Sequence, residues 1–114
     1  MITTLSGRRL VTDEGEMEYP EVSIEDGRIV RVDEGAPNGS TDTLTAAFFD
    51  VHVHGAVGHD FMAATPAEIV EVGRFLASRG VGHYLATTVT ASIDLTLRAL
   101  ENLADAIEGE SGHE

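Results

Sequence analysis

The stretch AAFFDVHVHG, residues 46–55, decides the fold, because a compact apolar run here ends in polar side chains and a glycine. Such a run is typical of a strand buried in a parallel sheet. A helix is predicted next: Thr65 is placed to cap it, and Glu68 to complete a capping box. Gly80 stands where a helix terminator belongs. A strand followed by a helix and another strand predicts a βαβ unit, and therefore an α/β fold.

A second strand and a second helix are predicted downstream. Residues 84–90 have the β-branched composition of a buried strand, and Ser92 is placed to cap the helix that follows. Apolar residues recur at helical spacing in both helices: Ile69, Val72 and Leu76 in the first, and Ile93, Leu97, Leu100, Ala104 and Ile107 in the second. Residues 109–114 have no periodicity and are predicted to form a loop. We interpret residues 47–114 as the first two βα units of a (β/α)8 barrel, incomplete because a whole barrel takes about 250 residues.

Residues 1–46 have a different pattern and are predicted to form a small β-rich module. The dipeptide Asp26-Gly27 is favoured where both central turn residues need positive φ, which predicts a β-hairpin between the alternating segments on either side of it. Weaker strand candidates lie at residues 2–5 and 9–11. So few short strands predict a module that cannot form a well-filled core of its own.

Charge and composition exclude several classes of partner. Seven basic and twenty acidic residues give a formal net charge of −13, which repels phosphate backbones and anionic lipids and argues against nucleic-acid or membrane binding. No apolar run approaches the roughly 18 to 20 residues that a membrane span needs. Because the chain has no cysteine, any metal must be held by histidine, carboxylate or backbone oxygen. We expect a cytoplasmic protein.

His52 and His54 are the strongest candidates for a functional site. Side chains two apart on a strand point to the same side, so both imidazoles should face one point. That point lies at the carboxyl end of the predicted strand, where parallel α/β folds place their active sites. Two such nitrogens suit zinc or ferrous iron, and Gly55 lets the chain turn away without crowding them. The alternative is a pair of exposed histidines with no ligand.

Other polar residues near the predicted site have weaker signals. Asp50 shares the parity of the histidine pair and either orients a ligand or accepts backbone hydrogen bonds. His59 and Asp60 lie in the following loop, where His59 is expected to be solvated. Strand packing explains Thr87 and Thr88, whereas Thr90 is late enough to reach the site. His83 is expected to begin its strand at the opposite end, and His113 in the tail has no signal.

The residues just described resemble those of a known family. Residues 49–55, FDVHVHG, are similar to the first-strand metal motif of the amidohydrolase superfamily. Residues 58–62, GHDFM, and residues 85–90, LATTVT, narrow the resemblance to N-acetylglucosamine-6-phosphate deacetylases. It covers nearly the whole chain. One departure is residues 46–49, where family members usually have a Pro-Gly before the strand; this changes a turn and not a ligand.

The resemblance implies a function. It implies a divalent metal, zinc or iron, bound through His52 and His54, and metal-assisted hydrolysis of the acetamide of N-acetylglucosamine 6-phosphate to glucosamine 6-phosphate and acetate. Some members lack this histidine pair and use one metal, so its presence keeps a two-metal site open. The remaining ligands and the catalytic aspartate are expected downstream of residue 114, which predicts that this chain alone is inactive. A full-length homo-oligomer is also expected. The alternatives are another amidohydrolase, such as a dihydroorotase-like cyclic amidase, and a non-catalytic β-plus-βα module.

Overall fold

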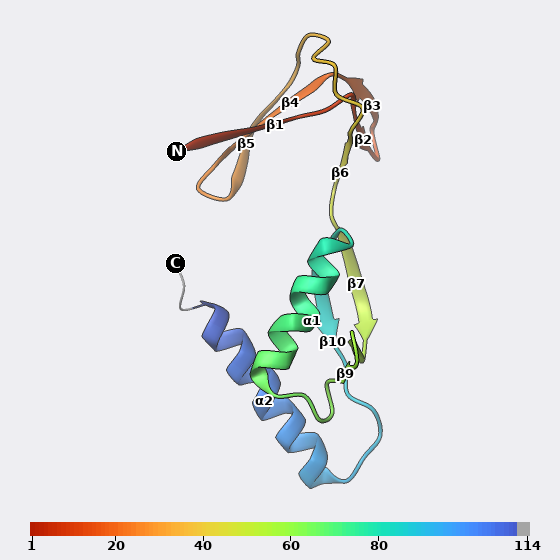
Figure 1. Ribbon diagram of the computed structural model, residues 1–114, viewed down its shortest axis with the longest axis vertical. Coiled ribbons are helices and arrows are strands. Elements are labelled where there is room, and N and C mark those ends of the chain that lie inside the picture. The colour runs from red at the N-terminus through yellow and green to blue at the C-terminus, as the bar shows by residue number, and fades with distance from the viewer. Residues whose placement is uncertain (112–114) are drawn as a thin grey trace. The chain divides into compact units, whose positions relative to one another are not determined.

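The computed structural model describes residues 1–111, in which the chain forms ten strands and two helices of mixed α/β class. It divides into two compact units, Met1–Ala46 and the residues from Ala47 onward. The first unit holds only strands, and both helices lie in the second (Figure 1). The mixed α/β class that the sequence predicts is confirmed.

The first unit contains the predicted hairpin. Strand β4 (Pro20–Glu25) pairs antiparallel with β5 (Arg28–Glu34), and β1 (Ile2–Ser6) pairs with the other edge of β4. Asp26 and Gly27 have φ of 49° and 71°, so the turn has the positive φ angles that its sequence predicted. Val22 is one of the few buried side chains in this unit. Other apolar side chains of the same sheet are exposed, with Ile2 at 59% and Ile29 at 66%. The expected small core is confirmed.

A second three-stranded sheet in this unit was only partly predicted. Strand β2 (Arg9–Thr12) lies between β3 (Gly15–Glu18), which is antiparallel to it, and β6 (Thr43–Thr45), which is parallel. Sequence reasoning missed β3 and β6. Glycine and glutamate are rare in strands, so β3 has no local signal, and β6 has only three residues and pairs with a strand more than thirty residues away.

The second unit is built on a parallel pair of strands. Strand β7 (Phe48–Val53) pairs with β10 (Val81–Ala86), and helix α1 (Pro66–Ser78) connects them and packs against them (Figure 1). Between β7 and α1 lies a two-residue ladder of β8 (Gly55–Ala56) with β9 (His59–Asp60). The predicted ends of α1 are confirmed, because Thr65 and Glu68 form a capping box and Gly80 has φ of 85°.

The core of this unit lies beneath α1. Its predicted stripe, Ile69, Val72 and Leu76, is buried as expected. Phe61 is fully buried with it and stacks on Tyr84, their ring centroids 6.0 Å apart. Phe61 of the GHDFM motif is therefore a core residue that anchors the segment between the histidine pair and α1.

Three predictions for the second half of the chain are wrong. The strand predicted over residues 84–90 is β10, which begins at Val81 and ends at Ala86, so His83 is internal to it. Helix α2 (Ile93–Ser111) continues through residues 109–111, which were predicted to be a loop, while residues 112–114, including His113, lie outside the described residues. The predicted stripe on α2 is exposed, and a different face packs inward; it consists of Ala99, Leu103 and Ala106.

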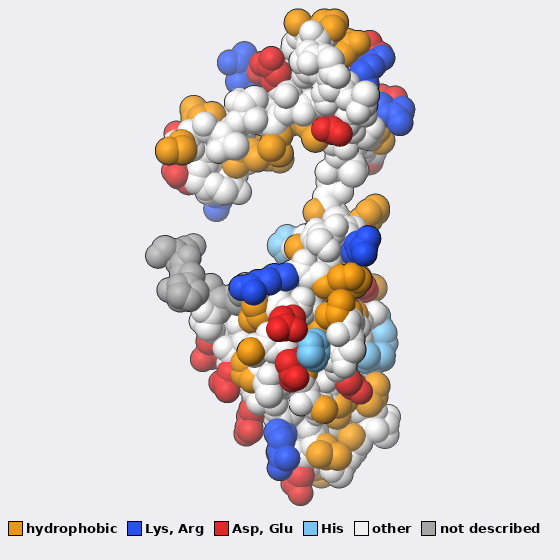
Figure 2. All heavy atoms as spheres, in the orientation of Figure 1, with side chains coloured by type: hydrophobic (Ala, Val, Ile, Leu, Met, Phe, Trp, Pro, Cys, Tyr) orange, Lys and Arg blue, Asp and Glu red, His pale blue; other side chains and the backbone are white. Residues whose placement is uncertain are grey.

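The apolar stripe on α2 is exposed to solvent. Ile93 and Ile107 are 77% and 66% exposed, because α2 rests on α1 through its small face and the stripe has no strand to cover. Apolar side chains also remain at the surface beside the strands, as the space-filling view shows (Figure 2). Of the helices within residues 1–111, none combines the length and apolar character that crossing a membrane requires.

Candidate metal site

His52 and His54 meet as their spacing predicts. Their Nε2 atoms lie 3.1 Å apart and their rings are in an edge-to-face arrangement, with centroids separated by 4.7 Å. Both side chains are exposed, so the pair is open to a ligand from solvent. His52 lies within β7 and His54 immediately follows it, at the carboxyl end of a strand whose neighbour is parallel.

Thr87 sets the orientation of the His54 ring. The Nδ1 atom of His54 lies 2.9 Å from the Thr87 main-chain oxygen and 3.1 Å from its hydroxyl. A carbonyl oxygen only accepts, so Nδ1 carries the proton and the lone pair of Nε2 faces His52. The hydroxyl in turn donates to the Val53 carbonyl at 2.9 Å. Thr87 therefore fixes both the tautomer and the direction of one candidate ligand.

The two imidazoles fit a tetrahedral divalent metal. Zinc–nitrogen bonds of 2.0–2.1 Å at tetrahedral angles hold neighbouring nitrogens about 3.3 Å apart, close to the 3.1 Å observed. The Nε2 lone pair of His54 also needs a proton or a cation opposite it. Within residues 1–111, however, no group of three or more histidine, aspartate or glutamate side chains could hold an ion. The described residues thus include two candidate ligands and no complete shell.

Asp50 and Gly55 support the strand on which the pair lies. The Asp50 carboxylate accepts the His52 backbone N–H at 3.1 Å, which matches the second of the two roles considered for it. Gly55 has φ of 146°, and a Cβ there would collide with the His59 carbonyl oxygen. Glycine is required at this position because the chain turns into the β8–β9 ladder, rather than to leave room at the histidines.

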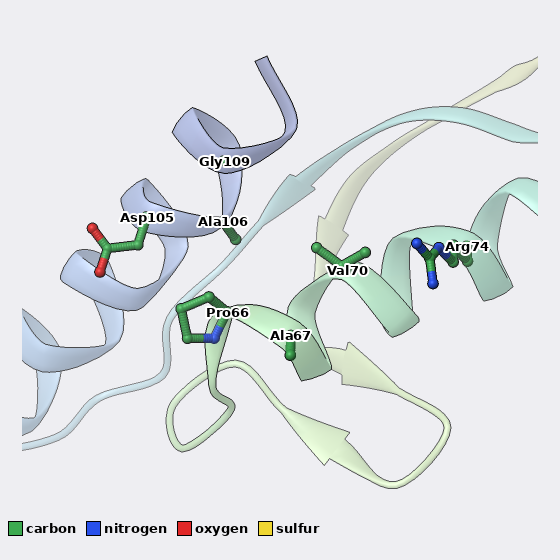
Figure 3. Close-up of a pocket in the computed structure, with 7 residues that line it drawn as sticks. All are labelled: Pro66, Ala67, Val70, Arg74, Asp105, Ala106 and Gly109. Carbon is green, nitrogen blue, oxygen red and sulfur yellow. The ribbon is translucent and has the colours of Figure 1, made fainter. Parts of the chain in front are cut away.

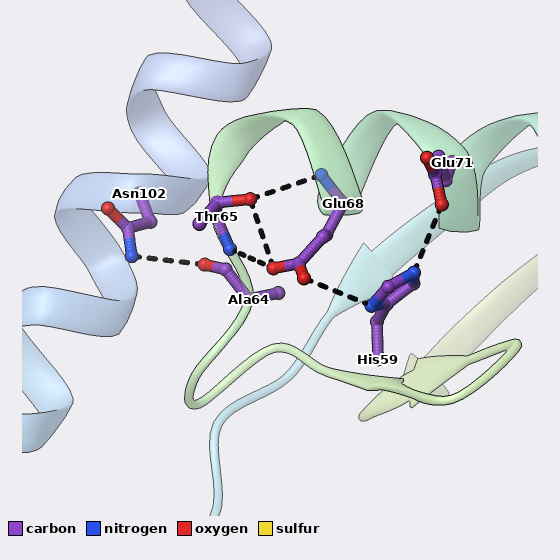
Figure 4. Close-up of polar contacts among 6 residues, drawn as sticks. All are labelled: His59, Ala64, Thr65, Glu68, Glu71 and Asn102. Carbon is purple, nitrogen blue, oxygen red and sulfur yellow. Dashed lines mark hydrogen bonds and ion pairs between the residues drawn. The ribbon is translucent and has the colours of Figure 1, made fainter.

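His59 is not the solvated loop residue that the sequence suggested. Its side chain is only 23% exposed and lies between two carboxylates of α1, as Figure 4 shows. Nε2 is 3.1 Å from Glu71, and Nδ1 is 3.5 Å from Glu68. The backbone and side chain of Thr65 donate to Glu68 and, with His59 adding a smaller effect, hold the pKa of that carboxyl below its ordinary value. A Glu three residues after the capping glutamate is the signal that sequence reasoning did not use.

The remaining candidates lie away from the pair or make no contact with it. His83 stacks on Phe49, and neither Thr88 nor Thr90 forms a hydrogen bond with either imidazole. A shallow, open depression between α1 and α2 is lined mainly by small and apolar side chains, with Arg74 and Asp105 at its edge (Figure 3). It contains no histidine, and Asp105 and Arg74 are its only charged side chains among the described residues, so we assign it no catalytic role.

The chain is similar in sequence to known deacetylases. No family model matches the chain. It is 34% identical over 107 residues to N-acetylgalactosamine-6-phosphate deacetylase of Escherichia coli O157:H7, a match that covers 91% of this chain and 28% of the relative. It is 38% identical over 77 residues to N-acetylglucosamine-6-phosphate deacetylase of Vibrio furnissii, covering 64% of this chain and 19% of that one.

Two solved structures from Mycobacterium smegmatis have the same fold over the length of this chain. Both are N-acetyl-D-glucosamine-6-phosphate deacetylase, one of them a variant in complex with N-acetyl-D-glucosamine-6-phosphate. The TM-scores are 0.77 and 0.76 at 27% and 28% identity, covering 95% and 94% of this chain but only 30% and 32% of those chains. The chain is related in sequence and in fold to amino-sugar 6-phosphate deacetylases.

The chain spans less than a third of the length of these deacetylases. That fraction agrees with a site in which the described residues provide two candidate ligands and no complete shell. Thr87 is the residue at this site that sequence reasoning missed, because it was assigned to strand packing. Ala86 of β10 pairs with Val53 of β7, so the residues that follow them, Thr87 and His54, come side by side. This register is the signal that could have identified Thr87.

Proposed function

We propose that this chain is part of a metal-dependent deacetylase that hydrolyses the acetamide of N-acetylglucosamine 6-phosphate to glucosamine 6-phosphate and acetate. The observation that supports this most is the histidine pair: two Nε2 atoms 3.1 Å apart at a strand end, in a chain related to deacetylases of this substrate class. The full-length protein, meaning the longer protein that we propose contains this chain, would carry the rest of the shell.

His52 and His54 would hold a divalent metal, zinc or iron, through their Nε2 atoms. When bound, the metal supplies an acidified water and polarises the acetamide carbonyl. The residues of this chain do the positioning. Thr87 keeps the proton of His54 on Nδ1, so that Nε2 is free to ligate, and Asp50 restrains the backbone at His52.

We further propose that residues 47–114 form the first two βα units of a (β/α)8 barrel, preceded by the β module of residues 1–46. The parallel pairing of β7 with β10 through α1 supports this, as does an open apolar groove between β10, α1 and α2. Leu100 and Ile107 of the exposed α2 stripe line that groove together with Leu85. A following strand beside β10 would cover these side chains, as sheet closure requires.

The substrate assignment has one specific competitor. The relative with the longer match acts, by its name, on N-acetylgalactosamine 6-phosphate. The two sugars differ only in configuration at one ring carbon. An assay with both sugars therefore decides between them.

Acetate release from the purified full-length protein tests the proposal. We expect turnover of N-acetylglucosamine 6-phosphate, with one free amine formed per acetate, and loss of turnover after chelation that zinc or ferrous iron reverses. Preference for the galacto sugar would change the substrate and keep the reaction class. Absence of turnover with either sugar, in protein that has its full metal content, would contradict the proposed function.

A further inference from the structure

The segment between the histidine pair and α1 contains a strained turn. Strands β8 and β9 are joined by Val57 and Gly58, whose φ angles are 48° and 88°. A β-branched residue strongly disfavours positive φ, and such a conformation persists only where the surroundings impose it. Val57 is 51% exposed, so burial of its own side chain does little to hold the turn.

This turn is directly connected to a candidate ligand. The carbonyl of His54 accepts the N–H of Phe61 at 2.8 Å, which closes residues 54–61 into a loop. Inside the loop, Ala56 pairs with His59 in the two-residue ladder. A change in the β8–β9 loop therefore moves the backbone of His54, the residue whose ring faces His52.

His59 is the side chain that ties the loop to α1. Its two ring nitrogens face Glu71 at 3.1 Å and Glu68 at 3.5 Å, from the first two turns of the helix (Figure 4). Glu68 is itself held by the Thr65 cap, and Asn102 of α2 donates to the adjacent Ala64 carbonyl at 3.0 Å. A carboxylate only accepts, so the neutral ring satisfies one of these partners and the protonated ring both.

We propose that His59 is a positioning residue: held between Glu68 and Glu71, it clamps the strained β8–β9 loop to α1 and thereby holds His54 in place for metal binding. This rests on the proposed function for the identity of the site. The role of His59 differs from those of the candidate ligands and of the core residues. Buried Phe61 anchors the end of the loop, whereas His59 anchors its middle.

The test measures the affinity of the full-length protein for Co²⁺, by titration of its visible absorption, in His59→Gln and Glu71→Gln. We expect affinity to fall about tenfold in His59→Gln, as for other residues that orient metal ligands, with an unchanged melting temperature of the metal-free protein. Glu71→Gln should act in the same direction, and the double variant should be no worse than His59→Gln alone. Glu101→Gln, an exposed glutamate of α2, is the matched control and should be unchanged.

A second variant tests the route of the effect. Val57→Asn places the favoured Asn-Gly pair in the turn and relieves the backbone strain at position 57 that the His59 clamp holds. Combined with His59→Gln, it should restore most of the lost Co²⁺ affinity. The proposal is overturned if His59→Gln binds Co²⁺ like wild type, if it lowers only the melting temperature, if Val57→Asn restores nothing, or if wild type binds no Co²⁺. Acetate release is measured separately. A protein that passes these Co²⁺ tests but shows no turnover would contradict the proposed function and leave the role of His59 intact.

Discussion

Replacing Thr87 by valine removes one hydroxyl and nearly preserves shape, which isolates its role beneath His54. The hydroxyl makes two contacts, 2.9 Å to the Val53 carbonyl and 3.1 Å to His54 Nδ1. The Val53 carbonyl keeps a second donor, the Thr87 backbone N–H at 2.9 Å, so no acceptor is left unsatisfied. We therefore expect a loss of unfolding free energy of only about 1 kcal/mol, the net value of one hydrogen bond.

The effect on metal binding should be larger than this stability loss suggests. His54 Nδ1 keeps the Thr87 main-chain oxygen at 2.9 Å, so the tautomer survives while the ring loses one of its two restraints. Removing a residue that orients a ligand typically costs 10–100-fold in metal affinity or activity, and we expect the lower end, about tenfold, with kcat falling more than KM rises. Metal competition titration and acetate release on the full-length protein measure both.

Thr88→Val is the matched control for this experiment. Thr88 is adjacent, equally β-branched and partly buried, and it forms no hydrogen bond with either imidazole. It should keep metal affinity and kcat within about twofold of wild type, since a substitution away from special features changes stability by only about 0.5 kcal/mol. Equal effects of the two substitutions would refute the assigned role of Thr87.

Three further predictions follow from the packing and charges of the second unit. Gly55→Ala should destabilise the full-length protein by roughly 1–3 kcal/mol and lower its metal content, whereas Gly109→Ala in α2, where a Cβ meets nothing within 4 Å, should be neutral or slightly stabilising in chemical unfolding. Because the folded pKa of Glu68 lies below its ordinary value of 4.5, its stabilising effect is present above that pH and lost as the pH falls through the folded pKa. Wild type and Glu68→Gln should therefore differ in melting temperature at neutral pH and converge in acid; a constant difference would contradict this. The 114-residue chain alone should bind a hydrophobic dye and melt without a cooperative transition, because side chains such as Phe48 and Val51 are 66% exposed; a sharp melt would show otherwise.

Local signals predicted the parts of the fold that depend on neighbours in sequence. The Asp26-Gly27 turn, the Thr65 capping box and the spacing of the histidine pair each act within four residues, and the structure has all three arrangements. The strands β3 and β6 and the inward face of α2 were missed because partners far along the chain decide them. For α2, two apolar faces compete: the large stripe has nothing to cover, so the small face of Ala99 packs on α1.

The same distinction holds for the site. Position on the strand predicted that His52 and His54 share a face, and this needs no tertiary information. Thr87 comes under His54 through the register of β10 against β7, and His59 meets Glu71 across the fold of the loop onto α1. Both contacts depend on how distant segments come together, and neither the strand register nor the Glu68–Glu71 spacing was used, which is why strand packing and solvation were the interpretations for these two residues.

Metal stoichiometry of the full-length protein tests the central claim most directly. The double variant His52→Ala/His54→Ala should lose at least one equivalent of bound metal per chain relative to wild type, as measured by elemental analysis after exhaustive dialysis. His83→Ala is the matched control, because it removes an exposed histidine from the neighbouring strand, and it should keep the full wild-type content. Wild-type metal content in the double variant would show that the pair at the end of β7 holds no metal.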